Sequence, residues 1–342
     1  MLNAARHSQI VALKEVQGLL KSSTTASLAD TLASIMLLAI FAGLTCDPDT
    51  ARAQWGKHVR GALAVLNGRP DSKDIDPIMD VLRSHVTSSV LIDCQQRSIS
   101  PPKQFQEIRF EPRIPVSFQE KSEFVLDKLA DLEHRDASIV AANGMIEDFD
   151  AVDRQLGDLV RILPRLHPYM IAKPAFDQVP AVHVYASHKS ARVWNIIRST
   201  KLKSYKLRFD KFKKMRQMAD TSILGDAIGI EEQLLYASSS ARAVVEEICA
   251  SVPEFLRSRE TALGTDAVNW VYSLLWPLSA ARASGHVPMH LNDYLFHQIQ
   301  TIWDVTGFPI ADYHKNDCGV DAEPENWSVS NVLETQWLAD PL

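Results

Sequence analysis

Apolar side chains recur along this chain every three or four residues, which is the spacing of amphipathic helices. In residues 50–68 they gather on one helical face, and Gly68 follows at the left-handed position that often ends a helix. Residues 31–44 are apolar on all sides, but this run is shorter than the roughly 18–20 residues of a membrane span, so it predicts a buried helix. Further helices are predicted at 76–96, 118–134, 145–163, 180–200, 204–219, 226–250, 265–284 and 290–305.

Prolines separate these helices. The polar stretch 98–117 begins with Pro101-Pro102 and predicts a long surface loop. A second irregular connection is expected where helix-breaking prolines cluster, at Pro164, Pro168, Pro174 and Pro180. No alternating apolar pattern of useful length predicts a strand. We therefore expect an all-α fold, a single large irregular helical bundle, with one domain over residues 1–315 and a tail over 316–342.

Composition narrows the class of protein. Hydrophobic residues make up 46% of the 342 residues and charged residues 23%, which is typical of a folded globular protein with a substantial core. The net charge of −6 argues against nucleic acid as the main partner. The first residues lack the basic start and apolar core of a secretory signal. We expect a soluble protein of the nucleus or cytoplasm, not bound to a membrane.

Common catalytic and metal-binding motifs are absent from the sequence. The four cysteines, Cys46, Cys94, Cys249 and Cys318, are far apart and are interpreted as buried free thiols, so no metal site is expected. The sequence has no glycine-rich nucleotide loop, nucleophile elbow or zinc-protease histidine pair. We accordingly expect no cofactor, and the residues identify no catalytic side chain.

Three short sequence motifs, which we call phrases, occur in the order that a known family shows. After the apolar run comes Trp55-Gly-Lys-His58 with Gly61-Ala62; Ile248-Cys-Ala-Ser-Val-Pro253 and Leu274-Leu-Trp-Pro-Leu278 follow later. Together they resemble the regulatory (ligand-binding, middle homology) domain of fungal binuclear zinc-cluster transcription factors. In that family the second phrase ends a long helix at a turn. The DNA reader of the family needs six close cysteines, so the resemblance implies a regulatory domain without that module and without direct sequence-specific DNA binding.

Two functions are compatible with this resemblance. In the first, the domain is a regulator that binds a hydrophobic small molecule resembling a secondary metabolite, a protein partner, or a second copy of itself. In the alternative, the scaffold is a co-opted biosynthetic enzyme of fungal secondary metabolism. It would be a cofactor-free cyclase or pericyclase, for example of the Diels-Alder type, because such reactions need mainly orientation and one or two hydrogen-bond donors. Whether the protein is an enzyme stays open.

The candidate ligand-binding residues lie mostly in one aromatic-rich region. The predicted pocket wall consists of Trp270, Tyr272, Trp276, Tyr294 and Trp303, although ordinary core packing explains such aromatic side chains equally well. Pro277 inside the predicted helix 265–284 is expected to kink it and to free a carbonyl near Ser273. His58, on the same helical face as Trp55, completes the set; its commoner role is a hydrogen bond to a neighbouring helix.

Charged segments and small residues suggest further contacts. Four carboxylates in residues 147–153 are interpreted as complementing a helix dipole rather than as a magnesium site. Residues 189–216 hold eleven Lys and Arg and one acid, and we expect a solvated cationic stripe, with nuclear import, nucleic-acid contact or an acidic partner as alternatives. The tail over 316–342 mixes acidic and apolar residues, as in coactivator-recruiting segments or a strap over the globule. The small pair Gly61-Ala62 predicts a close helix contact.

Overall fold

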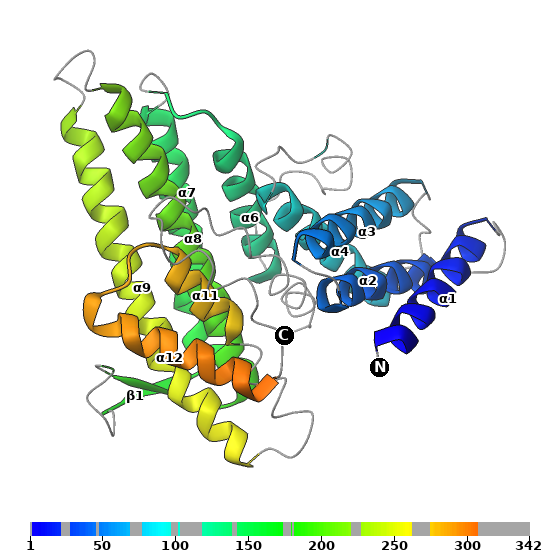
Figure 1. Ribbon diagram of the computed structural model, residues 1–342. Coiled ribbons are helices and arrows are strands. Elements are labelled where there is room, and N and C mark those ends of the chain that lie inside the picture. The colour runs from blue at the N-terminus through cyan, green and yellow to red at the C-terminus, as the bar shows by residue number, and fades with distance from the viewer. Residues whose placement is uncertain are drawn as a thin grey trace. The chain divides into compact units, whose positions relative to one another are not determined.

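The chain is predominantly helical in its computed structural model, which confirms the expected all-α class (Figure 1). The structure describes residues 2–21, 28–45, 48–68, 77–96, 102, 118–138, 142–173, 179, 181–219, 227–261 and 274–306. Where the sequence predicts one domain over 1–315, the described residues form two compact units, divided between His134 and Arg135. The predicted start of a tail at residue 316 lies outside the described residues.

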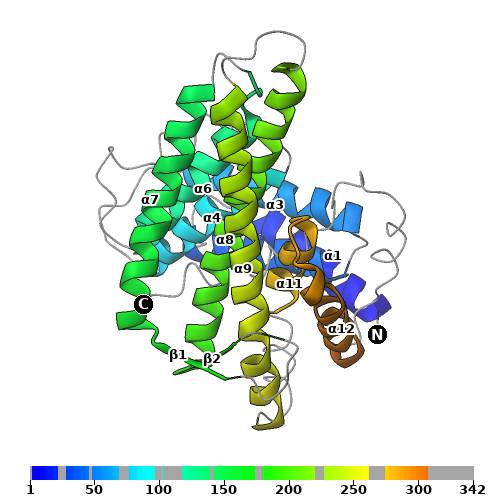
Figure 2. The same cartoon turned by 90° about the vertical axis from the view of Figure 1, so that its left-hand side faces the viewer.

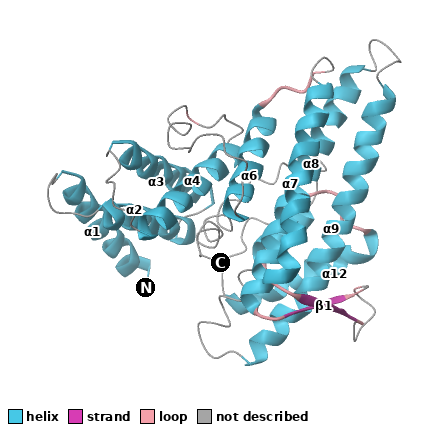
Figure 3. Cartoon of the chain, turned by 180° about the vertical axis from the view of Figure 1, so that it is seen from behind, coloured by secondary structure: helices cyan, strands magenta, loops and turns pink. Residues whose placement is uncertain are grey.

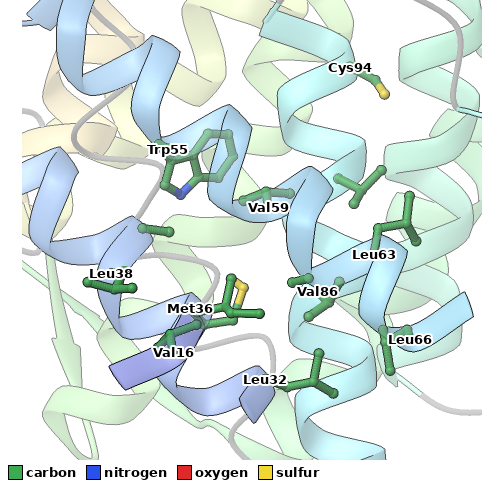
Figure 4. Packing of buried hydrophobic residues seen from close by; sticks show 14 of the residues in the cluster. Val16, Leu32, Met36, Leu38, Trp55, Val59, Leu63, Leu66, Val86 and Cys94 are labelled. Carbon is green, nitrogen blue, oxygen red and sulfur yellow. The ribbon is translucent and has the colours of Figure 1, made fainter. Parts of the chain in front are cut away.

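The elements described in the first unit are the helices α1 (Leu2–Lys21), α2 (Leu28–Thr45), α3 (Pro48–Gly68), α4 (Pro77–Gln96) and α6 (Phe118–His134). Helix α3 buries one face against α2 and α4, as its apolar spacing predicts (Figure 4). Trp55, with 1% of its surface exposed, lies in this core with Val59 and Ala62, which are fully buried. The first phrase of the resemblance, around Trp55, thus forms the buried face of α3 in the core of this unit.

Among the described glycines of α3, the one with a close neighbour is Gly56 rather than Gly61, which corrects the prediction for Gly61, and the neighbour is a side chain. A Cβ atom on Gly61 would meet nothing within 4 Å. A Cβ on Gly56 would lie 2.5 Å from Oδ1 of Asp93 on α4 and 3.0 Å from Nη1 of Arg60. Arg60 Nη1 donates to Oδ2 of the buried Asp93 at 2.6 Å. Gly56 therefore leaves the space in which a buried carboxylate lies against helix α3.

The second unit is built around two long helices that pack side by side (Figures 1 and 2). Helix α7 lies along the first of these. Of two shorter helices, one packs on both long helices and the other packs on the second long helix. In chain order the elements are α7 (Ala142–Leu166), β1 (Tyr169–Ala172), β2 (Val182–Tyr185), α8 (His188–Ala219), α9 (Ala227–Thr261), α11 (Leu275–Ala283) and α12 (Met289–Thr306). The fully buried faces of these helices form a core separate from that of the first unit.

The hairpin of β1 and β2 was not expected from the sequence. The two strands pair antiparallel, with Tyr169 opposite Tyr185 and Ala172 opposite Val182, at one end of the long helices (Figure 3). Strands of four residues are too short to show a convincing alternation. Residues 180–200 and 204–219, predicted as two helices, instead contribute strand β2 and the continuous helix α8.

Prolines interrupt the helices less than predicted. Helix α7 continues through Pro164 to Leu166, and α9 continues through Pro253 to Thr261, so the predicted turn of the second phrase is wrong. Helix α11 begins at Leu275, which places Pro277 in its first turn. The N–H groups of a first turn have no partner within the helix, so proline is tolerated there. Ser273, where a kink was predicted to free a carbonyl, lies outside the described residues.

None of the described helices combines enough length with enough apolar character to cross a membrane.

Candidate functional site

The structure describes only some of the residues of the predicted pocket wall. Trp270 and Tyr272 lie outside the described residues. Trp276 lies in α11 and Trp303 in α12, but the described part of the chain does not extend to their side chains. Tyr294 and His58 are described, in the second and the first unit respectively. The aromatic wall as a whole therefore stays a prediction.

Tyr294 is a half-buried residue of α12, the helix that packs on α9 and α11. Burial raises the pKa of its hydroxyl, and the nearby thiol of Cys249 on α9 adds to this rise. Among the described residues, the Tyr294 hydroxyl has no hydrogen-bond partner. It is therefore a neutral hydroxyl donor at neutral pH.

His58 lies at the edge of the buried face of α3 and is half-buried. Burial lowers the pKa of its imidazole, and the neighbouring Lys57 lowers it further, so the ring is neutral at neutral pH. The predicted hydrogen bond to a neighbouring helix is not found within the described residues. His58 remains a candidate on its own, in a different unit from Tyr294.

The second phrase of the resemblance forms the most enclosed turn of the second unit. Five consecutive residues of α9, from Ile248 to Val252, are at most 2% exposed. Because five consecutive residues cover every side of an α-helix, α9 is surrounded at this level. On one side Cys249 lies near Tyr294. On another, Ser251 accepts a hydrogen bond from Asn195 of α8 at 2.9 Å. This central turn of α9, residues 247–252, connects the elements of the unit.

Arg198 of α8 makes several polar contacts, although only 1% of its surface is exposed. Its Nε donates to Glu247 Oε2 at 3.0 Å. Its Nη1 donates to Asn195 Oδ1 at 3.1 Å and to the hydroxyl of Tyr185. Its Nη2 lies 3.1 Å from Nδ1 of His183. One guanidinium thus ties β2 to α8 and α9.

Aromatic rings enclose the same guanidinium. The Cζ atom of Arg198 lies 5.6 Å from the ring centre of Tyr169, 5.8 Å from that of Tyr185 and 5.3 Å from that of Trp194. Trp194 is itself fixed by a 2.7 Å hydrogen bond from Nε1 to the carbonyl of His167. Cations over aromatic faces are attracted by the ring quadrupole. We call Arg198, the three aromatic residues around it (Tyr169, Tyr185 and Trp194), and Glu247, Asn195 and His183 the Arg198 cluster.

The protonation states of the Arg198 cluster follow from its burial. Burial lowers the pKa of His183 to about 4, with the positive charge of Arg198 as the second cause. Burial raises the pKa of Tyr185 to about 12, partly offset by Arg198. At neutral pH, His183 is therefore neutral and its Nδ1 accepts the hydrogen bond from the guanidinium. The arrangement is suited to holding the hairpin in place, and the position of a cation in the aromatic cage is already taken by Arg198.

A second buried arginine explains the acidic segment of α7. Arg208, 2% exposed, contacts Oδ1 of Asp150 at 2.8 Å through Nη2 and Oδ2 of Asp153 at 3.0 Å through Nη1. Its Nε donates to Gln233 at 2.7 Å, and its Cζ lies 4.7 Å from the ring centre of Tyr236. The first turn of α7 holds no acidic residue, so the macrodipole interpretation of these carboxylates is wrong. Asp150 and Asp153 pair with an arginine of the next helix instead, and Asp148 pairs with Arg135.

Metal binding finds no support in this segment either, because no group of three or more His, Cys, Asp or Glu among the described side chains could hold an ion.

The expected cationic stripe of α8 is only partly solvated, which corrects the prediction. Arg198 and Arg208 are buried, and Arg216 pairs with Glu231 of α9 at 3.1 Å. A signal for the buried arginines was present in the sequence. They share the three-to-four-residue spacing of the apolar face, which comprises Trp194, Leu202, Tyr205, Phe212 and Met215, all buried.

Comparisons of the chain with models of protein families, with curated proteins and with solved structures find no match. The resemblance to the regulatory domain therefore stays a prediction that rests on the three phrases.

Proposed function

We propose that this chain is a regulatory-type helical domain without a DNA reader, whose second unit binds a hydrophobic small molecule. The observation that supports this most directly is the hydroxyl of Tyr294. It is a half-buried donor without a partner among the described residues, and it lies near the central turn of α9. An acceptor atom on a bound ligand would pair with it, and a hydrogen bond of this kind typically contributes about 0.5–1.5 kcal/mol.

The surroundings of Tyr294 favour an apolar ligand with few polar atoms. Helix α12 buries Leu291, Leu295 and Ile299 where it packs with α9 and α11. A mainly apolar wall with one hydrogen-bond donor is typical of sites for small hydrophobic molecules. Cys249, the polar neighbour on α9, has its pKa raised to about 12 by burial and stays a neutral thiol.

The position of the site also supports a regulatory role. The central turn of α9, near which Tyr294 lies, holds the Arg198 cluster through Glu247 and Ser251. An effector that binds at Tyr294 therefore acts on the segment that fixes the hairpin. A ligand shifts a conformational equilibrium only by its difference in affinity for the two states. A ligand beside the central turn can have such a difference between the state in which the hairpin is held and the state in which it is released.

A ligand titration tests the proposal. The full chain is titrated with neutral ketones of terpenoid, polyketide and steroid size, including progesterone, and affinity is measured by calorimetry. Replacing Tyr294 by Phe keeps the ring and removes the hydroxyl, so we expect binding to weaken about tenfold, the loss of one hydrogen bond. The matched control is Tyr236→Phe on α9, whose hydroxyl bonds to Asp153 and lies in the Arg208 environment; it is expected to leave the affinity unchanged.

The outcome separates the proposal from its alternatives. Binding of none of the ketones, or equal binding by the Tyr294→Phe variant, would contradict the site. Recovery of a chemically altered ligand after incubation would favour the biosynthetic enzyme instead. Regulation is tested by fusing the full chain to an unrelated DNA-binding domain and recording reporter output with and without the ligand. An unchanged output with a bound ligand would refute the regulatory role.

A further inference from the structure

The outer face of the β1–β2 hairpin is apolar, which is unusual for an exposed sheet. Side chains of paired residues lie on the same face of an antiparallel sheet. Tyr169 with Tyr185, and Ile171 with His183, form the inner face, which contributes three of its side chains to the Arg198 cluster. The outer face is formed by Met170 with Val184 and Ala172 with Val182.

This outer face remains exposed to solvent in the second unit. Met170 is 70% exposed, and Val182, Val184 and Ala172 are half-buried. Ile171, although it shares the inner face, is still 69% exposed, and Leu166 at the end of α7 is 50% exposed. A solvated sheet face ordinarily carries polar side chains, so an apolar one marks a contact surface. We call Met170, Ala172, Val182 and Val184 the hairpin patch.

Positive charge lies at both ends of this patch. Arg165 ends α7 before β1, Lys173 directly follows β1, and both are exposed. Lys189 is exposed in the first turn of α8, which follows β2. Between residues 165 and 190 the sequence holds these three cations and one acid, Asp177, which lies outside the described residues. The segment that carries the patch thus has a positive excess, while the whole chain has a net charge of −6.

We propose that the hairpin patch is a docking surface for an acidic peptide segment of a partner protein, one that carries aromatic or aliphatic side chains between its carboxylates. The apolar side chains of the segment pack on Met170 and Val184, and its carboxylates face Arg165 and Lys173. Methionine adapts its shape to different apolar partners. Complementary charge selects the partner and speeds its association. This inference rests on the proposed regulatory function and names the kind of partner that the regulator engages.

Two other occupants fit the charges less well. A second copy of the chain, docked patch to patch, would bring the cations of one copy near those of the other. An anionic membrane is an extended surface, so the net charge of −6 of the chain would repel it. Only a few cations near the patch would attract it. A bound peptide interacts mainly with the charges next to it, because electrostatic interactions beyond about 8 Å are largely screened at physiological salt.

Peptide binding to the full chain tests the proposal. The probe is a fluorescent peptide of Glu and Asp alternating with Leu and Trp. One control peptide carries Lys in place of the acids, and another carries Ala in place of Leu and Trp. Fluorescence anisotropy should show binding of the first peptide only, weakening as salt is raised. Met170→Ser combined with Lys173→Glu should weaken it at least about tenfold. Leu235→Ser combined with Lys213→Glu is the matched control, because Leu235 is equally exposed, at 70%, on α9.

Each result decides for or against the patch. Failure of the acidic peptide to bind, or equal binding by both double variants, overturns the proposal. Equal binding of the lysine peptide overturns the role of charge. Sedimentation with phosphatidylserine vesicles that is lost in the Met170→Ser, Lys173→Glu variant identifies a membrane instead, and a dimer lost in that variant identifies a second copy. Tyr294→Phe should leave peptide binding unchanged, so failure of the ligand site and failure of the patch are separate results.

Discussion

Arg198 and Arg208 are neutralised in different ways, although both are almost completely buried in α8. Arg208 pairs with two carboxylates, Asp150 and Asp153. Arg198 has one carboxylate partner, Glu247, and otherwise relies on neutral acceptors and aromatic rings. A buried charge without partners is too costly to persist, so each network is a condition for its helix to pack. Removing one partner of a buried arginine therefore destabilises the unit more than removing one partner of an exposed ion pair would.

At the residue scale, the two glycines of α3 give a matched prediction. We expect Gly56→Ala to destabilise the protein by roughly 1–3 kcal/mol, because its Cβ would displace the buried carboxylate of Asp93. Gly61→Ala, with open space around its Cβ, should stabilise it by about 0.5–1 kcal/mol, because alanine favours a helix over glycine. Urea unfolding of both variants measures the difference. Two changes of the same sign would contradict the geometry at Gly56.

At the scale of elements, helix α8 joins the parts of the second unit. Its N-terminal half binds the hairpin through Arg198, and its C-terminal half binds α7 through Arg208. The helix runs unbroken over residues 188–219 because no proline or glycine interrupts it and its buried face continues throughout. The hairpin depends on this helix, since an isolated two-stranded hairpin is at best marginally stable in water.

The attachment of the hairpin predicts a dependence on pH. The pKa of His183 falls from 6.5 to about 4 on folding. The unfolded chain therefore binds the proton more readily, so the stabilisation is complete above pH 6.5 and is lost as the pH falls towards 4. Between pH 7.5 and 5, His183 should account for about 2 kcal/mol of lost stability. Urea unfolding at several pH values measures the total loss.

His183→Asn is the control for this pH effect. Its side-chain oxygen can replace Nδ1 as the acceptor for Arg198 but does not titrate in this range. We expect this variant to stay folded and to show a smaller loss of stability between pH 7.5 and 5. An unchanged pH dependence would show that His183 is not the responsible group. His188, whose pKa burial lowers to about 3, should still contribute in both proteins.

At the scale of the whole molecule, each unit has a core of its own. The core of the first unit lies between α2, α3 and α4, and that of the second between α7, α8 and α9. The family-like phrases are divided between them, with Trp55 in the first and the central turn of α9 in the second. Both phrases form buried seams, so packing explains these apolar residues without reference to a ligand. The ligand argument rests on Tyr294 instead.

Truncations in the two cores should act on different units. Leu63→Ala in α3 and Leu159→Ala in α7 each remove a buried side chain, at an expected cost of about 2–5 kcal/mol. Hydrogen exchange followed by mass spectrometry should show the greatest loss of protection within α2–α6 for the first variant and within α7–α12 for the second. Equal loss across both units in either variant would argue against separate cores.

The helices were predictable from the sequence because their signal is local. The apolar spacing in residues 50–68 and 118–134 matches α3 and α6 closely, since a helix buries one face with a fixed period. The same period placed Arg198 and Arg208 on the buried face of α8, but charge suggested exposure. What fills a buried position depends on residues far away in the sequence, such as Glu247 for Arg198 and Asp150 for Arg208.

The sequence by itself determined that this is a predominantly helical protein, because the periodicity and the helix-forming residues lie within each segment. Only the tertiary structure decided that Gly56, not Gly61, allows a close approach, that two arginines are buried, and that a hairpin precedes α8. The physical reason is that burial and pairing arise between segments. Their free energies depend on partners that the local pattern of a single segment does not contain.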